Sequence, residues 1–103
     1  MGRTVDFTED AGDDVAFAAR YYAGLRSGLG GEFSDRVVDA VYELADRPYR
    51  GREVRSGIRQ VVLRRFPYLI FYAVEDDRVV AIAVISSARD PAYIDRVLSR
   101  RRP

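Results

Sequence analysis

Two apolar runs separated by four polar residues constrain the fold of this chain more than any other feature. The runs are Tyr68–Val74 and Val79–Ser86, and Glu75-Asp76-Asp77-Arg78 lies between them. Neither run alternates between apolar and polar side chains, which is typical of strands that are buried on both faces of a sheet. A polar link this short is typical of a β-hairpin. We therefore predict a central hairpin, covered by helices on one face and by a further layer on the other.

Shorter strands are expected before this hairpin. Residues 58–65 alternate between two sets of side chains, which predicts a strand whose successive side chains point to opposite faces. Proline cannot donate to a strand ladder, so Phe66-Pro67-Tyr68 should form a turn or a bulge. The segment Val54–Ile58 is compatible with a bend or with a short strand. Val5-Asp6-Phe7 predicts a short first strand.

The spacing of apolar residues predicts two helices ahead of the strands, over 14–26 and over 32–46. Thr8 or Asp13 could cap the first of them. The glycine-rich segment 27–31 should separate the two helices, because glycine is costly inside a helix. Asp90-Pro91 begins a turn, and the apolar spacing that follows predicts a short terminal helix within 91–103.

These elements predict a single domain over residues 1–103 with an α+β fold. The expected order is β-α-α-β-β-β, with a short C-terminal helix. In this arrangement an antiparallel helical hairpin packs on one face of a small, mainly antiparallel sheet. A chain of 103 residues is the size of one domain. Such a chain buries roughly 60–70% of the surface of its unfolded state, which is enough for one modest core.

The missing residue types restrict the chemistry. The chain has no His, no Cys and no Lys, so all 17 of its basic residues are arginine. This excludes a Ser/His/Asp triad, a Schiff-base lysine, a cysteine nucleophile and a thiolate zinc site. The acidic clusters Asp13-Asp14 and Glu75-Asp76-Asp77 lack the spacing of a calcium loop. We expect no metal and no cofactor, so any catalysis would depend on Tyr, Ser, Asp, Glu, Arg or backbone groups.

The sequence shows neither the pattern of a membrane-spanning helix nor that of a signal peptide. No apolar run approaches the roughly 20 residues of a membrane-spanning helix. Met1-Gly2-Arg3-Thr4 is not followed by the apolar segment of a signal peptide. Because there is also no cysteine for a disulfide, we expect a cytoplasmic protein that does not contact a membrane.

Charge is divided unevenly along the chain. Residues 1–46 carry four arginines and ten acidic residues, a balance of −6. Residues 47–103 carry thirteen arginines and six acidic residues, a balance of +7. This asymmetry is compatible with a polyanionic or acidic partner for the second half, and equally with a solvated surface whose charges compensate each other.

Arginine and tyrosine supply the candidate binding side chains. The guanidinium group clamps phosphate or carboxylate, and exposed tyrosine rings offer stacking surfaces. On the first helix, Tyr22 is in phase with the apolar face, so the adjacent Tyr21 is exposed or lies at a contact. A basic, aromatic sheet face could bind RNA or the acidic tail of a protein, and ordinary solvated sheet edges would give the same pattern. The candidates for binding a protein or nucleic-acid partner are Tyr21, Arg55, Arg59, Arg65, Tyr68, Tyr72 and Arg89.

Several segments, in this order and spacing, resemble the RelE/ParE superfamily of bacterial toxins. The resemblance extends from about residue 5 to residue 91. It implies a type II toxin that is held inactive by a cognate antitoxin, whose extended or helical C-terminal segment would wrap the toxin. Contact with DNA would then be indirect, through the antitoxin. The segments are Val5-Asp6-Phe7, Ala19-Arg20-Tyr21-Tyr22, Gly28-Leu29-Gly30-Gly31-Glu32-Phe33, Arg64-Arg65-Phe66-Pro67-Tyr68-Leu69-Ile70-Phe71-Tyr72 and Arg89-Asp90-Pro91.

The resemblance implies one of two activities. RelE-like members cut mRNA in the ribosomal A site, and here such a nuclease would use Arg64, Arg89 and Tyr93. ParE-like members poison DNA gyrase. In the nuclease branch, basic residues usually stand at strand positions that here hold Gln60 and Val62.

The same branch usually has a further basic residue after the leading tyrosine of the hairpin, where this chain has Leu69. These departures weaken the nuclease interpretation. The Tyr21-Tyr22 pair on the first helix and the Arg-Phe-Pro-Tyr segment that leads into the hairpin look more like ParE-like members of the superfamily. We therefore expect a ParE-like gyrase inhibitor. A RelE-like ribosome-dependent mRNA endonuclease and a degenerate, non-toxic antitoxin-binding module are the alternatives.

Overall fold

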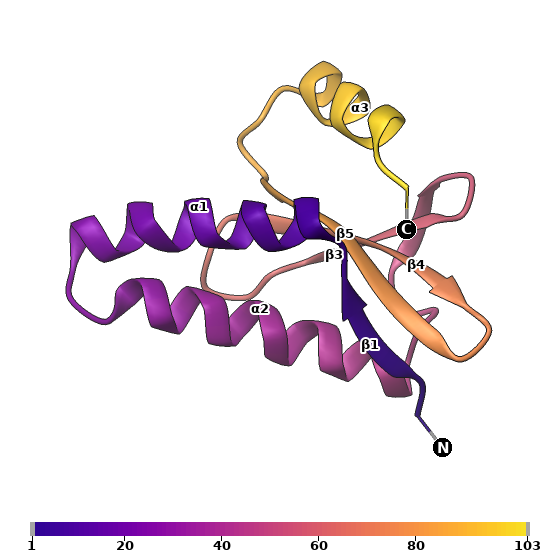
Figure 1. Cartoon of the computed structure of the whole chain (residues 1–103). Coiled ribbons are helices and arrows are strands. Elements are labelled where there is room, and N and C mark those ends of the chain that lie inside the picture. Colours follow the sequence, from indigo (N-terminus) through magenta and orange to yellow (C-terminus); the bar gives the residue numbers. More distant parts are fainter. Residues whose placement is uncertain (1, 103) are drawn as a thin grey trace.

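The computed structural model describes residues 2–102, which form five strands and three helices (Figure 1). The predicted α+β order is confirmed, with one strand more than expected. The additional strand, Arg52–Arg55, overlaps only in part the segment for which the sequence allowed either a bend or a short strand, because it begins two residues before Val54. In chain order the elements are β1 (Thr4–Phe7), α1 (Glu9–Leu25), α2 (Leu29–Asp46), β2 (Arg52–Arg55), β3 (Ile58–Val62), β4 (Tyr68–Glu75), β5 (Arg78–Ser86) and α3 (Pro91–Arg100).

The five strands form one mixed sheet in the order β1-β5-β4-β3-β2. The predicted central hairpin is β4–β5, which pairs antiparallel over its whole length. On one side of it, β3 and β2 continue the antiparallel pairing. On the other side, β1 pairs parallel with the first part of β5, as far as Phe7 opposite Ala81. Beyond Ala81, the outer edge of β5 has no strand partner in the described part of the chain.

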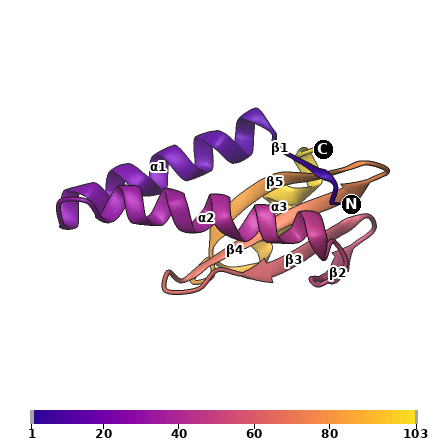
Figure 2. The same ribbon diagram turned by 90° about the horizontal axis from the view of Figure 1, so that it is seen from below.

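Helices cover the sheet on both faces (Figure 2). The α1–α2 hairpin packs on one face, and α3 lies on the other, where it supplies the further layer that the sequence required. Successive residues of a strand point to opposite faces. Accordingly, Val79 and Ala81 of β5 belong to the cluster under α1 and α2, whereas Val80 and Ile82 belong to the cluster that contains Leu98 of α3.

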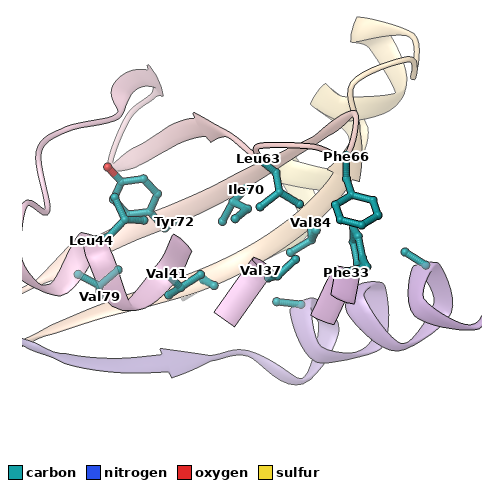
Figure 3. Packing of buried hydrophobic residues seen from close by; sticks show 13 residues of the cluster. Phe33, Val37, Val41, Leu44, Leu63, Phe66, Ile70, Tyr72, Val79 and Val84 are labelled. Carbon is teal, nitrogen blue, oxygen red and sulfur yellow. The ribbon is translucent and has the colours of Figure 1, made fainter. Parts of the chain in front are cut away.

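The larger core lies between α2 and the sheet, with contributions from α1. Figure 3 shows a row of α2 side chains facing side chains of the strands and of the turn before β4. The row is spaced by three and four residues, so it occupies one face of the helix. The labelled residues of α2 are Phe33, Val37, Val41 and Leu44, and those opposite them are Leu63, Phe66, Ile70, Tyr72, Val79 and Val84.

Helix α1 begins at Glu9, five residues earlier than predicted. Of the two candidate caps, Thr8 is the one used, because its hydroxyl oxygen accepts a hydrogen bond from the backbone N–H of Ala11 (3.1 Å). The predicted start was too late because apolar periodicity is clear only from Val15. Ala11 is nevertheless fully buried, so the first turn also packs against the core.

Helix α2 begins at Leu29, three residues earlier than predicted, so the glycine-rich segment is only partly a turn. Gly28 has a φ of 85°, in the left-handed region that glycine adopts without strain. Gly30 lies inside the helix and against α1. A Cβ at Gly30 would lie 3.2 Å from the Cβ of Ala23 and closer still to the carbonyl oxygen of Ala19. Glycine is therefore needed there for the close approach of the two helices.

The strand predicted over 58–65 ends at Val62, so its last three residues were predicted incorrectly. The chain turns instead, with the N–H of Leu63 bonded to the carbonyl of Tyr68 (2.9 Å) and with a φ of 73° at Arg65. Leu63 and Phe66 are both buried in the larger core, although the alternation placed them on opposite faces.

Candidate functional site: a cleft between the first helix, the fifth strand and the C-terminal helix

A cleft of about 320 Å³ opens between α1, the end of β5 and α3. Its more deeply buried lining is apolar and includes Ala18 and Val84. Its more exposed lining combines aromatic rings with a guanidinium group. The lining residues are Asp14, Phe17, Ala18, Tyr68, Val84, Ile85, Ser86, Arg89, Tyr93, Val97 and Arg101.

Arg89 and Tyr93 lie together at the mouth of this cleft, on the segment that follows β5. The side chain of Asp90 accepts a hydrogen bond from the N–H of Ala92 (2.8 Å), and Pro91 occupies the first turn of α3. Asp90 is thus the N-cap of α3, at the position where the sequence predicted the start of a turn. This local geometry places the Cζ atom of Arg89 4.3 Å from the centre of the Tyr93 ring, a cation–π contact.

Tyr68 contributes a third polar aromatic group to the cleft. Its ring packs edge-on against Phe33 (4.9 Å between centroids) and lies 6.2 Å from the ring of Tyr22. Burial raises the pKa of the Tyr68 hydroxyl, with smaller contributions in the same direction from Tyr22 and Tyr21, while Arg89 acts in the opposite direction. At neutral pH the hydroxyl is therefore protonated and can donate a hydrogen bond into the cleft.

Arg101 closes one end of the cleft by an ion pair with Asp14. Its guanidinium donates to both carboxylate oxygens (Nη1–Oδ2 2.5 Å and Nη2–Oδ1 3.1 Å) and to the carbonyl of Ile82 (3.0 Å). Asp14 also accepts a hydrogen bond from the N–H of Val84 (2.9 Å). Ile82 and Val84 belong to the part of β5 that β1 does not reach. The pair therefore satisfies backbone groups at an open sheet edge.

Within residues 2–102, no helix is long and apolar enough to cross a lipid bilayer. In the same range, no three or more potential ligand side chains come together in a group that could hold a metal ion.

A family model, described as the ParE toxin of the type II toxin–antitoxin system parDE, matches residues 5–91. The chain belongs to the ParE toxin family. The superfamily resemblance noted in the sequence is thus confirmed. Of the secondary elements of this ParE-family chain, α3 lies almost wholly beyond the matched residues.

Solved structures have the same fold as this ParE-family chain. One is the chromosomal ParDE system from P. aeruginosa, with a TM-score of 0.73 and 18% identity, covering 82% of this chain and 95% of that one. Another is a mutant of the E. coli toxin RelE in the free state, with a TM-score of 0.59 and 19% identity, covering 97% of this chain and 99% of that one. A comparison with curated proteins gives no match.

Two of the three residues expected for a nuclease come together in this ParE-family chain. Arg89 and Tyr93 are in contact at the cleft. Arg64 lies in the turn after β3 and is absent from the cleft lining; it lines a separate groove beside α2, together with Arg36 and Arg50. The three side chains therefore do not line one cavity.

The remaining sheet arginines are dispersed rather than gathered on one basic face. Arg55 donates to the carbonyl of Asp95 on α3 (3.5 Å). Arg59 donates to the carbonyl of Gly51 (2.7 Å) and lies over the ring of Tyr49. Arg65 is exposed, 3.9 Å from a carboxylate oxygen of Glu32 on α2. Each of these arginines thus has a local structural contact.

The expectation that Tyr72 offers an aromatic surface is wrong. Its side chain is 0% exposed, and its hydroxyl donates to the carbonyl of Pro48 (2.8 Å) and accepts from the N–H of Gly51 (2.9 Å). In the register of β4, Tyr72 faces α2, where it joins the larger core. Its role is to anchor the loop between α2 and β2.

Tyr21 is exposed, as the sequence predicted, and it belongs to an apolar stripe on α1. The stripe consists of Phe17, Tyr21 and Leu25, whose side chains are 69%, 60% and 61% exposed. Phe17 and Leu25 were not predicted to be exposed. The four-residue spacing of these three residues was the signal that could have found them.

Proposed function

We propose that this chain is the toxin of a type II toxin–antitoxin pair, that it inhibits DNA gyrase by binding, and that a cognate antitoxin neutralises it. The observation that carries the proposal is the match of the ParE toxin family model to residues 5–91. The likeness in fold to the ParDE system from P. aeruginosa supports an antitoxin partner. Its place of action would be the cytoplasm, where gyrase and DNA are found.

The chemistry of the cleft supports binding rather than catalysis. Among the described residues that line it, Asp14 is the only carboxylate, and it is already held by Arg101 and by the N–H of Val84. Tyr68 has a raised pKa because of burial and its tyrosine neighbours, so it is a poor proton acceptor at neutral pH. Neither group is placed to act as the general base that attack by a ribose hydroxyl would require.

The apolar stripe of Phe17, Tyr21 and Leu25 supports the antitoxin part of the proposal. Between Asp14 and Arg26, α1 carries a single charged residue, Arg20, so the stripe lies on a sparsely charged stretch of helix. The Cζ atom of Arg20 lies 5.9 Å from the centre of the Phe17 ring. Exposed apolar side chains in such a row mark a surface that a partner covers. We propose that an amphipathic segment of the antitoxin packs along it, with its apolar side chains spaced to match the helix.

A gyrase supercoiling assay tests the proposal directly. Purified chain is added to gyrase, relaxed plasmid and ATP, and we expect supercoiling to stop. Addition of the antitoxin in equal amount should restore it, which controls for non-specific inhibition. A correctly folded chain that leaves supercoiling unchanged in excess over gyrase would contradict the proposal.

The alternative of a RelE-like mRNA endonuclease is supported by the contact of Arg89 with Tyr93 and by the fold likeness to RelE. It predicts that mRNA is cut on translating ribosomes. It also predicts that Arg89→Ala and Tyr93→Phe abolish the cleavage. Toxicity that persists in both variants would remove this alternative.

Induction of the chain in bacteria that carry a DNA-damage reporter separates all three interpretations. Growth arrest with the reporter on supports trapped gyrase–DNA complexes. Arrest with a silent reporter supports the endonuclease. Normal growth, with the chain present in soluble form, supports a non-toxic module that only binds the antitoxin.

A further inference from the structure

The outer edge of β3 is left without a strand partner at its C-terminal end. Strand β2 pairs with β3 only as far as Arg52 opposite Gln60, while β3 continues to Val62. The N–H of Leu63 bonds to the carbonyl of Tyr68, on the β4 side. Because backbone groups alternate in direction along an antiparallel strand, the N–H and C=O of Val62 point away from β4. One donor and one acceptor therefore lie at this open edge.

This position is unprotected within the described residues. At the other open edge, Asp14 and Arg101 bond to backbone groups of β5 that β1 does not reach. Within residues 2–102, no side chain bonds in this way to the backbone of Val62. The Val62 side chain is itself 69% exposed. Proteins usually protect a sheet edge with charge, proline or a covering segment, so an exposed valine at an open edge marks a place where another strand can pair.

A groove of about 120 Å³ lies beside this edge, between β3 and α2. Its floor includes the apolar residues Ala40, Val61 and Leu63, and its rim carries charges of both signs. One pair on the rim is already formed, between Arg50 and Glu43 (3.3 Å). A rim with further charges of both signs can be complementary to a copy of itself. The rim residues without an ion-pair partner within residues 2–102 are Arg36, Asp39 and Arg64.

We propose that this edge is a contact between two copies of the chain, in which β3 pairs antiparallel with β3 about a two-fold axis at Val62. Two opposed residues of an antiparallel ladder can exchange both of their N–H···O bonds, and the outward groups of Val62 allow this exchange. The axis also brings the two Val62 side chains together, and pairs of apolar side chains across strands are favourable. Arg64 of each copy then lies toward Asp39 and Glu43 of the other. This contact goes beyond the proposed function, which involves gyrase and an antitoxin only.

A second copy fits this edge better than a segment of a single charge sign. A strongly acidic segment would be repelled by Asp39 and Glu43, and a strongly basic one by Arg36 and Arg64. The two-fold arrangement opposes unlike charges instead. The edge is also separate from the stripe proposed for the antitoxin. Phe17 of that stripe lines the cleft beside β5, and β3 lies two strands away from β5 in the sheet.

The dimer should be weak and reversible. Arg52 occupies the position opposite Gln60, so the paired strands extend only over residues 61–63. Interfaces of small area are typical of transient association. The contacts of Arg64 are at the surface, so salt should screen them and weaken the dimer further. We therefore expect a monomer in dilute solution and a growing fraction of dimer as the protein concentration rises.

Sedimentation velocity of the purified chain over a range of concentrations tests the proposal. We expect the sedimentation coefficient to rise reversibly with concentration. In NMR spectra, the amide signals of residues 61–64 and of the α2 residues at the groove should shift over the same range. Neither gyrase nor antitoxin is present, so the outcome does not depend on the proposed function. A coefficient that stays constant, or shifts confined to the α1 stripe, would overturn the proposal.

Three substitutions of Val62 connect the association to this edge. Val62→Pro removes the N–H that the pairing needs, at an edge position where the monomer does not use it. Val62→Lys places like charges opposite each other across the axis. Both variants should stay monomeric at every concentration. Val62→Thr is the matched control, because it keeps the N–H and the β-branched shape, and it should still associate. Urea denaturation verifies that each variant is folded. Association that survives in both Val62→Pro and Val62→Lys would contradict the proposal.

A charge reversal tests the ion pairs, and the antitoxin tests the competing occupant. Arg64→Glu should weaken the association several-fold at low salt, and less at high salt. Arg102→Glu is the control with the same change in net charge, at an exposed residue after α3, and it should have no effect. An extended segment of the antitoxin is the other occupant that could pair with this edge. If the wild-type chain stays monomeric while Val62→Pro loses affinity for the antitoxin, the edge belongs to the antitoxin and the proposal is wrong.

Discussion

Asp14 and Arg101 are 87 positions apart in the sequence, yet they form a two-point ion pair that joins the first helix to the end of the chain. The side chains of both residues are largely shielded from solvent, with 20% and 18% of their surface exposed. Leu98 is buried in the cluster under α3. The pair and this apolar contact together hold α3 over the second face of the sheet.

The Asp14–Arg101 pair should contribute measurably to stability. We expect Arg101→Gln to lower the free energy of unfolding by about 2 kcal/mol, because hydrogen bonds to charged groups contribute about 1.5–3 kcal/mol and Asp14 would lose its partner. Urea denaturation measures the change. Arg102→Gln is the matched control, since that neighbour is exposed, and it should stay within about 0.5 kcal/mol of the wild type. Equal losses in both variants would show that the pair is not the cause.

Gly30 and Gly31 are neighbouring residues of α2, but only Gly30 lies against α1, so substituting each of them in turn tests the close contact of the two helices. A Cβ at Gly30 would overlap the backbone of Ala19, so Gly30→Ala should destabilise the protein by about 1–3 kcal/mol through overpacking. A Cβ at Gly31 meets nothing within 4 Å, so Gly31→Ala should stabilise the helix by roughly 0.5–1 kcal/mol. Thermal unfolding of both variants tests the opposite signs. A stabilising Gly30→Ala would mean that the helices do not approach as closely as described.

Tyr72 should make the protein sensitive to alkaline pH. Burial raises its pKa above the ordinary value of 10.0, in opposition to its hydrogen bond with Gly51 and to nearby Arg59 and Arg50. The unfolded chain therefore loses this proton first. The contribution of the protonated Tyr72 hydroxyl to the free energy of unfolding is therefore fully present below about pH 10. Above that pH the contribution decreases, by at most about 1.4 kcal/mol per pH unit.

The variant Tyr72→Phe checks this assignment. At neutral pH it should cost about 1–3 kcal/mol, because the N–H of Gly51 and the carbonyl of Pro48 lose their partner. Above pH 10 its stability should fall less steeply than that of the wild type. Tyr42→Phe, at an exposed tyrosine of α2, should leave both quantities unchanged. Identical alkaline slopes in wild type and Tyr72→Phe would contradict the prediction.

The proposed antitoxin surface is tested by two tyrosines that are equally exposed. Tyr21 and Tyr42 are each 60% exposed, but Tyr21 lies in the apolar stripe of α1 and Tyr42 lies on α2. If the antitoxin covers the stripe, Tyr21→Ala should weaken antitoxin binding by about 30-fold, the effect of losing roughly 2 kcal/mol at an interface hot spot. Calorimetric titration should find Tyr42→Ala nearly unchanged. A larger effect at Tyr42 would move the antitoxin to α2.

The central hairpin was predictable because its signal is local. Tyr68–Val74 and Val79–Ser86 differ from the observed β4 and β5 by one residue at one end each. The start of α1 was harder to predict from the sequence, because the buried Ala11 does not belong to a regular pattern of apolar residues. The turn at Arg65 was missed because a positive φ at a non-glycine residue depends on its surroundings.

The candidate site was predictable only in part. The resemblance to the RelE/ParE superfamily suggested Arg89 and Tyr93, which lie four residues apart on one segment. The basic and aromatic pattern of the strands suggested Tyr68. Tyr72 was misplaced because strand alternation defines two faces without saying which one a helix will cover. Phe17 was missed because exposure is decided by the same packing.

The sequence by itself determined the family, the order of the elements and the lack of His, Lys and Cys chemistry, because these follow from residue identity and short-range spacing. Only the tertiary structure decided that Asp14 meets Arg101, that Arg64 stands apart from Arg89, and that α3 closes the second face of the sheet. Those outcomes depend on contacts between distant segments, and such contacts form only where packing and hydrogen bonding offset the entropy of bringing the segments together.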